Sequence, residues 1–330
     1  MLTAALDKPP LIALVGPTAV GKTKYSIALA ERFDCEIISG DSMQVYKGMD
    51  IGTAKITPEE TRGIPHHMID IYEPDYPFSA AEFQERARQL ILDIHGRGKL
   101  PMMVGGTGLY IEALCYGYRF TEGGVDEQYR NQLRQLLTSE GEQALYDKLK
   151  AVDPETAARL HPRDTRRVIR ALEIYHLSCK PMSQQLQERN RESPYRLCLI
   201  GLTMDRQKLY ERIDQRVDLM LEQGLVAEVE RLLARGYGPD LVSMQGLGYK
   251  EIAAYLTGQI SLDEAVYLLK RNTRRFAKRQ WSWFRHMKEI QWVDITDTEN
   301  FSEHLQTISA IITGKFGLNE EYNGEQPFRP

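Results

Sequence analysis

Residues 16–23 carry the clearest chemical signal in the chain. They read Gly-Pro-Thr-Ala-Val-Gly-Lys-Thr and match the pattern GxxxxGK[ST], between an apolar run at 11–15 and a helical pattern that begins at Lys22. In such a loop the glycines let successive backbone N–H groups turn toward phosphate oxygens, and the following helix adds its positive dipole end. Lys22 supplies a point charge and Thr23 a hydroxyl for Mg²⁺. The segment predicts a polyphosphate site without specifying which polyphosphate.

A conventional P-loop nucleoside triphosphatase holds its Mg²⁺ with a second acid at the end of another core strand. Here the expected strand at 101–104 ends in Gly105-Gly106-Thr107-Gly108. Asp70 follows a shorter apolar segment and is a weaker candidate for that acid. The pattern therefore argues against a conventional ATPase. Two successive glycines suit close approach of a bulky ligand to the backbone, and a turn that needs positive φ accounts for them equally well.

Asp41 follows a second expected strand, at 36–39, within Ser39-Gly-Asp-Ser-Met-Gln44. In a parallel sheet the carboxyl end of this strand lies beside the phosphate loop, on the edge where ligands bind. A carboxylate at this position could bind Mg²⁺, cap a helix or act as a general base, and the local sequence is compatible with all three.

Basic residues are concentrated in two helical segments of a chain whose net charge is −4. Residues 265–288 contain eight basic residues, five aromatic residues and no acid. Helical spacing predicts an apolar face with Leu269, Phe276, Trp283 and Met287, and a basic face with Arg271, Arg275, Lys278 and Arg285. A second group comprises Arg163, Arg166, Arg167 and Arg170. Such faces suit a nucleic-acid backbone, and solvated helix surfaces are the alternative.

Arg212 and Arg216 lie four residues apart on another expected helix, so they share one face. Together they could clamp an anion. The neighbouring acids Glu211 and Asp214 make ordinary surface ion pairs an equal alternative.

Short apolar strands alternate with helical patterns along most of the chain. We expect strands at 11–15, 36–39, 67–71, 101–104, 197–200 and 290–293, and helices at 22–33, 79–96, 206–223, 226–234 and 262–286. This alternation predicts an α/β fold with a parallel sheet of the P-loop NTPase type, flanked by helices. Only helices are expected at 126–137, 141–152, after Asp153 and at 165–177. The predicted organisation is a core at 1–120, an all-helical insertion at 121–193, completion of the core at 194–316 and a disordered tail at 317–330.

The composition excludes several protein classes. With 330 residues and 42% hydrophobic residues, the chain has enough apolar material for a core, so a collagen-like or largely disordered protein is excluded. Its four cysteines are scattered without metal-ligand spacing, which indicates a reducing compartment. No apolar run reaches membrane-spanning length. We expect a cytoplasmic monomer that does not contact a membrane.

Taken together, the segments at 11–23, 36–55, 105–111, 164–175, 245–251 and 271–284 resemble the bacterial tRNA dimethylallyltransferases, also called isopentenyl-diphosphate:tRNA transferases. One departure is Cys179, where the family pattern leads us to expect glycine.

The resemblance implies a function and a set of site residues. The function is transfer of a dimethylallyl group from dimethylallyl diphosphate to N6 of adenosine 37, beside the tRNA anticodon, with release of diphosphate and with Mg²⁺ as cofactor. The implied partners are dimethylallyl diphosphate and the tRNA anticodon stem-loop. Asp41 corresponds to the general base, with Lys22, Thr23 and Thr107 completing the catalytic group, and Thr23 is the implied metal ligand. Diphosphate binding is implied at Gly16, Thr18, Ala19, Val20, Gly21, Lys22, Thr23, Arg212 and Arg216. tRNA binding is implied at Asp41, Ser42, Met43, Gln44, Thr107, Arg163, Arg166, Arg167, Gln245, Gly246, Leu247, Gly248, Tyr249 and Lys250.

Three other functions compete with this interpretation. A P-loop kinase would transfer phosphate from ATP and would be indifferent to tRNA. A prenyltransferase acting on free adenine nucleotides would need neither the helical insertion nor the second basic group. An RNA-binding module without enzymatic activity would leave the intact phosphate loop unexplained. The tRNA prenyltransferase accounts for all of these features.

Overall fold

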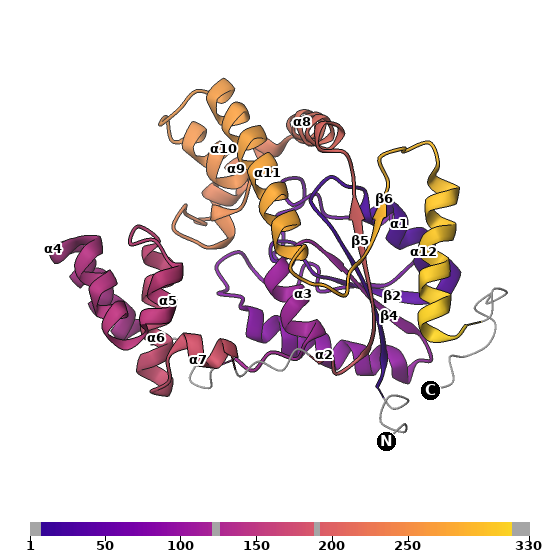
Figure 1. The fold of residues 1–330 in the computed structure, drawn as a ribbon. Coiled ribbons are helices and arrows are strands. Elements are labelled where there is room, and N and C mark those ends of the chain that lie inside the picture. Colours follow the sequence, from indigo (N-terminus) through magenta and orange to yellow (C-terminus); the bar gives the residue numbers. More distant parts are fainter. Residues whose placement is uncertain (1–7, 121–125, 188–191, 319–330) are drawn as a thin grey trace, which may run out of the picture. The chain divides into compact units, whose positions relative to one another are not determined.

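The computed structural model describes residues 8–120, 126–187 and 192–318. The chain divides into two compact units, one formed by Met1–Cys115 with Ser193–Pro330 and the other by Tyr116–Glu192. Figure 1 shows the path of the chain through both. The expected tail and the first residues of the expected insertion lie largely outside the described residues, and Gly317 ends the last described helix.

The larger unit is built on a parallel sheet in the strand order β3-β2-β4-β1-β5-β6. The strands are β1 (Pro10–Val15), β2 (Cys35–Ser39), β3 (His66–His67), β4 (Leu100–Gly105), β5 (Arg196–Thr203) and β6 (Gln291–Asp294). Every residue of β1 and β2 is buried, as expected for central strands covered on both faces. The predicted α/β fold with a parallel sheet is confirmed.

The third strand is shorter than the sequence predicts. Only His66 and His67 pair with β2, and the expected continuation to residue 71 is wrong. Met68 and Asp70 both have positive φ, at 65° and 53°, which takes the backbone out of the extended conformation.

Helices cover both faces of the sheet (Figure 1). In the larger unit they are α1 (Lys22–Phe33), α2 (Ala80–Gly96), α3 (Gly108–Cys115), α8 (Arg206–Glu222), α9 (Leu225–Ala234), the 3₁₀ turn η1 (Ser243–Gln245), α10 (Tyr249–Leu256), α11 (Leu262–Phe284) and α12 (Phe301–Phe316). Met102 belongs to the core formed with α1 and α12. The next side chain, Met103, lies on the opposite face, toward Ile111 of α3.

Serine caps set the starts of two of the helices that the sequence predicts, α2 and α11. Ser79 accepts the Glu82 N–H at the start of α2, and Ser261 accepts the Glu264 N–H at the start of α11. The sequence analysis missed α3, α10 and α12, and also α7 (Met182–Gln187) of the smaller unit. Of these, α10 follows Gly248 and α12 follows Asn300, and neither of these cap residues makes a side-chain cap bond.

The buried face of α11 differs from the prediction. Leu269 and, just beyond the helix, Met287 are buried as expected, and the other buried members of the helix are Ala265, Ala277, Gln280 and Phe284. Trp283 is 40% exposed and Phe276 only half-buried. The face of α11 that meets the core is therefore rotated away from Phe276 and Trp283 and toward Ala277 and Gln280. Of the predicted basic face, Arg275, Lys278 and Arg285 are exposed, whereas Arg271 is half-buried.

Where the structure describes it, the smaller unit contains helices and no strand: α4 (Glu127–Val152), α5 (Pro154–Arg159), α6 (Thr165–Ser178) and α7 (Met182–Gln187). Gly141 has φ 86° and ψ 180°, so α4 is two helical segments joined at a kink where two helices are predicted. The buried carboxylate of Glu173 accepts the Asp126 N–H and pairs with Arg130 and Arg170. Arg170 therefore ties α6 internally, whereas Arg163, Arg166 and Arg167 are exposed. In neither unit is a described helix long and apolar enough to cross a membrane.

Cys179 offers a test of local backbone strain. It ends α6 with φ 54°, in the left-handed region that an L residue occupies at a cost and glycine occupies freely. We predict that Cys179→Gly raises the free energy of unfolding by about 1 kcal/mol, measured by urea denaturation. Cys179→Ala, which keeps the Cβ atom, is the matched control and should give no such gain. Equal stability of the two variants would contradict the explanation.

Candidate active site

The phosphate loop connects β1 to α1 through an unusual backbone. Gly16, Ala19 and Gly21 have φ values of 153°, 63° and 108°. A Cβ atom on Gly16 would lie 2.7 Å from the Leu202 carbonyl oxygen, so β5 approaches too closely for any other residue. Gly21 precedes α1 without a side-chain cap bond. The first N–H groups of α1 are therefore available to an anion.

Lys22 lies folded back on this loop. Its Nζ donates to the Gly16 carbonyl at 2.9 Å and to the Pro17 carbonyl at 2.8 Å. Burial and, to a smaller extent, the neighbouring Arg216 lower the pKa of Lys22 to about 7, and Asp41 opposes both effects. A buried ammonium beside a guanidinium is electrostatically incomplete, and an anion would stabilise it.

A cavity of about 690 Å³ lies over the loop. The predicted residues among those lining it are Thr18, Ala19, Gly21, Lys22, Thr23, Asp41, Gln44, Arg212 and Arg216. Gly16 and Val20 do not line it. Gly16 is needed beneath the loop for the approach of β5, and the Val20 side chain is buried in the core. Their implied contacts with diphosphate stay predictions.

The two arginines of α8 meet in this cavity. Burial lowers the pKa of Arg216, the Asp41 carboxylate opposes this shift, and Arg212 adds to it. Asp214 instead pairs with Arg274, and Glu211 accepts a hydrogen bond from Gln207. Within the described part of the chain no acid forms an ion pair with either arginine, which favours the anion clamp over surface ion pairs.

Asp41 stands directly after β2 and begins a turn, not a helix. Its Oδ1 accepts the Met43 N–H at 2.8 Å, and the described residues between β2 and α2 form no helix. The helix-cap alternative is therefore excluded. Thr107 holds the same turn, because its Oγ1 accepts the Ser42 N–H at 3.0 Å.

The diglycine is explained by close packing. Neither Gly105 nor Gly106 has positive φ, so the alternative of a strained turn is wrong. A Cβ atom on Gly105 would lie 2.4 Å from the Gly40 carbonyl oxygen, and one on Gly106 would lie 2.2 Å from Nε2 of Gln280. Both glycines also line the 690 Å³ cavity. The backbone at this point must therefore approach its neighbours very closely.

A second cavity, of about 320 Å³, adjoins the first. The residues that line both are Thr18, Asp41, Thr53, Arg216 and Phe276. Of the residues predicted to bind tRNA, the second cavity is lined by Asp41, Ser42, Met43, Thr107, Gln245, Gly246, Leu247, Tyr249 and Lys250. Gln44 lines the first cavity instead. Gly248 lines neither, because its φ of 92° serves the backbone turn that starts α10.

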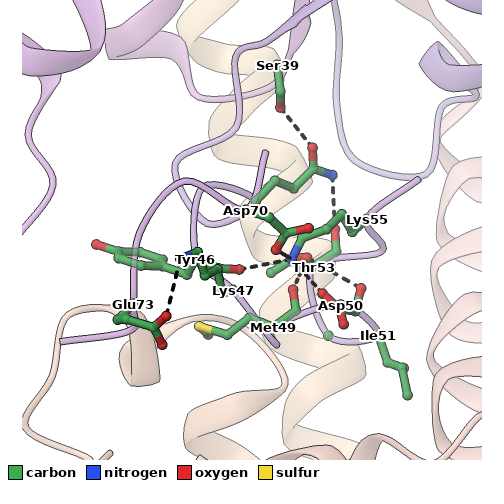
Figure 2. A network of polar contacts seen from close by, with 12 residues as sticks. Ser39, Tyr46, Lys47, Met49, Asp50, Ile51, Thr53, Lys55, Asp70 and Glu73 are labelled. Carbon is green, nitrogen blue, oxygen red and sulfur yellow. Dashed lines mark hydrogen bonds and ion pairs between the residues drawn. The ribbon is translucent and has the colours of Figure 1, made fainter. Parts of the chain in front are cut away.

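The segment that follows Asp41 is held by the polar network in Figure 2. The Gln44 amide accepts from the Ser39 hydroxyl at 2.8 Å and donates to the Thr53 and Ala54 carbonyls at 3.4 Å. Lys55 pairs with Asp70, with 2.6 Å between Nζ and Oδ1. Asp70 lines neither cavity and its carboxylate is paired with Lys55, which argues against a role as the second metal acid.

Glu228 is a site-supporting residue that the sequence analysis missed. It is 2% exposed, and its carboxylate accepts the backbone N–H groups of Asp50, Ile51 and Gly52 at 3.1, 2.8 and 3.1 Å. It also accepts the Tyr249 hydroxyl at 2.6 Å. These bonds fix two walls of the second cavity against α9. An acid on the apolar face of an amphipathic helix is the signal that could have identified it.

Gln280 and Phe276 were also missed as site residues. Gln280 bonds both the phosphate loop and the diglycine segment, and Phe276, expected in the core, lines both cavities. Gln280 carries the same signal as Glu228, a polar residue within a buried helix face.

Comparison with known proteins identifies the family. A model of the IPP transferase family matches residues 44–287, and one of the isopentenyl transferases matches residues 9–73. The tRNA dimethylallyltransferase of Geobacillus thermodenitrificans is 54% identical over 308 residues, which cover 93% of this chain and 98% of that protein. The chain belongs to the tRNA dimethylallyltransferase family. The resemblance stated from the sequence is confirmed, and the chain is a transferase.

Other relatives support the same assignment. The Bacillus subtilis tRNA dimethylallyltransferase is 53% identical over 94% of this chain and 99% of its own. The crystal structure of a tRNA isopentenylpyrophosphate transferase from Bacillus halodurans has a TM-score of 0.71 at 51% identity and covers 93% of this chain and 97% of its own. A eukaryotic dimethylallyltransferase described as acting on tRNA has a TM-score of 0.81 at 31% identity, over 98% of this chain and 82% of its own.

The lowered pKa of Lys22 predicts a pH dependence of anion binding. As pH rises above about 7, Lys22 loses its proton and its attraction for inorganic diphosphate, so affinity falls by up to about tenfold per pH unit. Lys22→Arg is the control, because a guanidinium keeps its charge. Inorganic diphosphate itself gains charge with pH in both cases. The measurement is therefore the ratio of the dissociation constants of the wild-type protein and of Lys22→Arg for inorganic diphosphate, determined by calorimetry from pH 6 to 9. A constant ratio would contradict the prediction.

Proposed function

We propose that this enzyme transfers the dimethylallyl group of dimethylallyl diphosphate to N6 of adenosine 37 in tRNA and releases diphosphate. The observation that carries the proposal is the junction of the two cavities at Asp41. One cavity has the cations and backbone amides that suit a diphosphate. The other is lined by the turn after β2 and by residues 245–250, and it suits an adenine base. The acid that lines both would stand between donor and acceptor.

The diphosphate end supplies positive charge where negative charge develops. As the allylic C–O bond breaks, charge grows on the leaving diphosphate. Lys22, the N–H groups at the start of α1, Arg212 and Arg216 would stabilise it.

Magnesium fits the same end of the cavity. Thr23 lines it at the first turn of α1, and among the described residues no group of three or more ligating side chains occurs. Mg²⁺ commonly keeps several waters and binds through one or two protein oxygens plus substrate phosphates. The Thr23 hydroxyl would hold it. When bound, Mg²⁺ would supply further neutralisation of the diphosphate charge.

The acceptor end requires removal of a proton. The N6 nitrogen forms a bond to C1 of the dimethylallyl group while the bond from C1 to the diphosphate oxygen breaks and its electron pair leaves with diphosphate. The nitrogen then carries a positive charge, and Asp41 accepts its proton. Of the two carboxylate oxygens of Asp41, only Oδ1 has a hydrogen-bond partner among the described residues. The carboxylate therefore retains the capacity to accept a further hydrogen bond. Thr107 would line the channel and hold the Asp41 turn.

Binding of tRNA would use the predicted basic residues. Arg275, Lys278 and Arg285 of α11 are exposed, as are the arginines of the smaller unit at 163, 166 and 167. These would hold the backbone of the anticodon stem-loop. The acceptor base must leave its stack to enter the cavity, at a cost of a few kcal/mol that is smallest in a single-stranded loop. Ser42, Met43 and residues 245–250 would contact the unstacked bases.

A labelled-transfer assay tests the function. Dimethylallyl diphosphate labelled in the allyl group is incubated with the protein, Mg²⁺ and unmodified tRNA, beside parallel reactions with AMP and with ATP alone. We expect label in tRNA and its loss when adenosine 37 is replaced. Label in AMP only would indicate a free-nucleotide prenyltransferase, and consumption of ATP without transfer would indicate a kinase.

Replacement of Asp41 tests the base. We predict that Asp41→Ala and Asp41→Asn lower turnover by about 10²–10⁴, the usual effect of losing a general base. Asparagine can still accept the Met43 N–H, so it separates loss of the base from loss of the turn. tRNA affinity should stay within a few-fold, as measured by filter binding. Asp70→Asn, which lies outside both cavities, is the control acid. Unchanged turnover in Asp41→Asn would remove Asp41 from the reaction.

A further inference from the structure

Gln280 joins three parts of the chain that are distant in sequence. Its Oε1 accepts the backbone N–H of Thr18 in the phosphate loop at 2.8 Å, and its Nε2 donates to the Gly106 carbonyl at 2.9 Å. The side chain extends from α11 and is 6% exposed, at the wall of the 690 Å³ cavity. The side-chain amide of Gln280 thus connects the phosphate loop to the Gly105-Gly106 segment at the wall of the cavity.

The phosphate loop needs such support because its conformation is strained. Ala19 has φ 63°, which costs an L residue about 1 kcal/mol or more, and strained backbone persists only where the surroundings hold it. Two side-chain anchors hold the first half of the loop: Lys22, through the carbonyls of Gly16 and Pro17, and Gln280, through Thr18. Within the loop, the Val20 N–H makes only a long bond of 3.4 Å to the Pro17 carbonyl.

These two anchors differ in what an incoming anion does to them. Lys22 is the loop's own cation, so a bound diphosphate competes with the carbonyls of Gly16 and Pro17 for its ammonium. Gln280 is neutral and has both of its bonds to backbone groups. It can therefore keep the loop in place while Lys22 turns to the anion.

The packing around Gly106 fits this role. A Cβ atom there would lie 2.2 Å from Nε2 of Gln280, so only glycine allows the bond. Glycine is therefore required at position 106 so that Gln280 can form its bond to the Gly106 carbonyl. This explains the second glycine of the diglycine independently of close approach to a ligand.

We propose that Gln280 is a positioning residue that fixes the phosphate loop in its diphosphate-binding conformation and sets its distance from the Gly105-Gly106 wall. The proposal rests on the proposed function, because it assumes that the loop holds a diphosphate. Gln280 does not contact the reacting atoms. Its effect reaches the substrate through the Thr18 amide.

Gln280→Met tests the proposal, since methionine has similar length and cannot make either bond. The matched control is Gln84→Met. Gln84 is also 6% exposed and donates to a backbone carbonyl, that of Ala113 at 2.7 Å, but it does not contact the phosphate loop. Both variants lose a buried glutamine, so a merely structural role predicts similar effects on thermal unfolding and no selective effect on the donor substrate.

We expect Gln280→Met to raise the dissociation constant of inorganic diphosphate and the KM for dimethylallyl diphosphate about tenfold, in line with the loss of one or two hydrogen bonds. The dissociation constant for tRNA should change less than twofold, and Gln84→Met should change neither substrate constant. If Gln280→Met does not fold, Gln280→Asn keeps the amide but is one carbon too short to span both groups, and it should shift the diphosphate constants in the same direction.

The outcomes separate the two proposals. If the wild-type protein does not bind inorganic diphosphate, the proposed diphosphate site is wrong and the role of Gln280 falls with it. If the wild-type protein binds and the folded Gln280 variant binds within twofold of it, the positioning role is overturned while the proposed function stands.

Discussion

The site depends on an electrostatic constraint: two positive charges, on Lys22 and Arg216, are buried side by side with one carboxylate nearby. Burial lowers the pKa of both, Arg216 adds to the lowering of the Lys22 pKa and Arg212 to that of the Arg216 pKa, and Asp41 compensates only in part. In the described structure the ammonium of Lys22 is satisfied by two carbonyl oxygens, which are dipoles and not charges. Charges held in this way destabilise the empty protein and are stabilised by an anion. Under the proposed function, a bound diphosphate would therefore gain part of its binding free energy by stabilising these two buried cations.

The order of the strands brings the other components to these charges. β1 lies between β4 and β5, and β4 lies next to β2, so the carboxyl ends of three neighbouring strands carry the phosphate loop, the diglycine and Asp41. α8, which follows β5, adds the two arginines from the other side of the loop. Close approach at Gly16 and at Gly105 lets these strand ends converge. A side chain at either position would push apart the groups that have to act together.

The local components of the site could be predicted from the sequence because each has a local cause. The phosphate loop follows from glycines and a lysine at fixed spacing, α1 from the pattern after it, and the position of Asp41 from the strand before it. Other residues of the same motifs support the backbone: Gly16 makes room for Leu202, Val20 packs in the core and Gly248 precedes a helix. A motif specifies which residues are needed and does not distinguish contact with a ligand from support of the loop.

The supporting residues could not be placed from the sequence because their partners are distant. Gln280 meets Thr18 across 262 residues, and Glu228 meets Ile51 across 177. Each was visible only as a polar residue on an apolar helix face, a pattern that many surface-adjacent positions share. Both residues lie on amphipathic helices and accept hydrogen bonds from backbone N–H groups of loops. Gln280 accepts from Thr18, and Glu228 accepts from residues 50–52. This explains why polar groups are buried there: a loop that forms a cavity wall has no strand neighbour to accept its N–H groups, so a side chain must do so.

The shared position of Asp41 links the two ends of the proposed reaction. The carboxylate opposes the lowering of the Lys22 and Arg216 pKa values, so in the empty site it helps to keep both cations charged. When a proton from the acceptor neutralises Asp41, the carboxylate no longer stabilises the charges of Lys22 and Arg216. At that stage the leaving diphosphate carries its full negative charge and stabilises them in place of Asp41. Under the proposed function, proton transfer at one end and charge development at the other therefore compensate each other electrostatically, and the net charge in the buried site changes little during the reaction. Such compensation is favourable where water is excluded, because a low dielectric penalises any step that leaves a charge unbalanced.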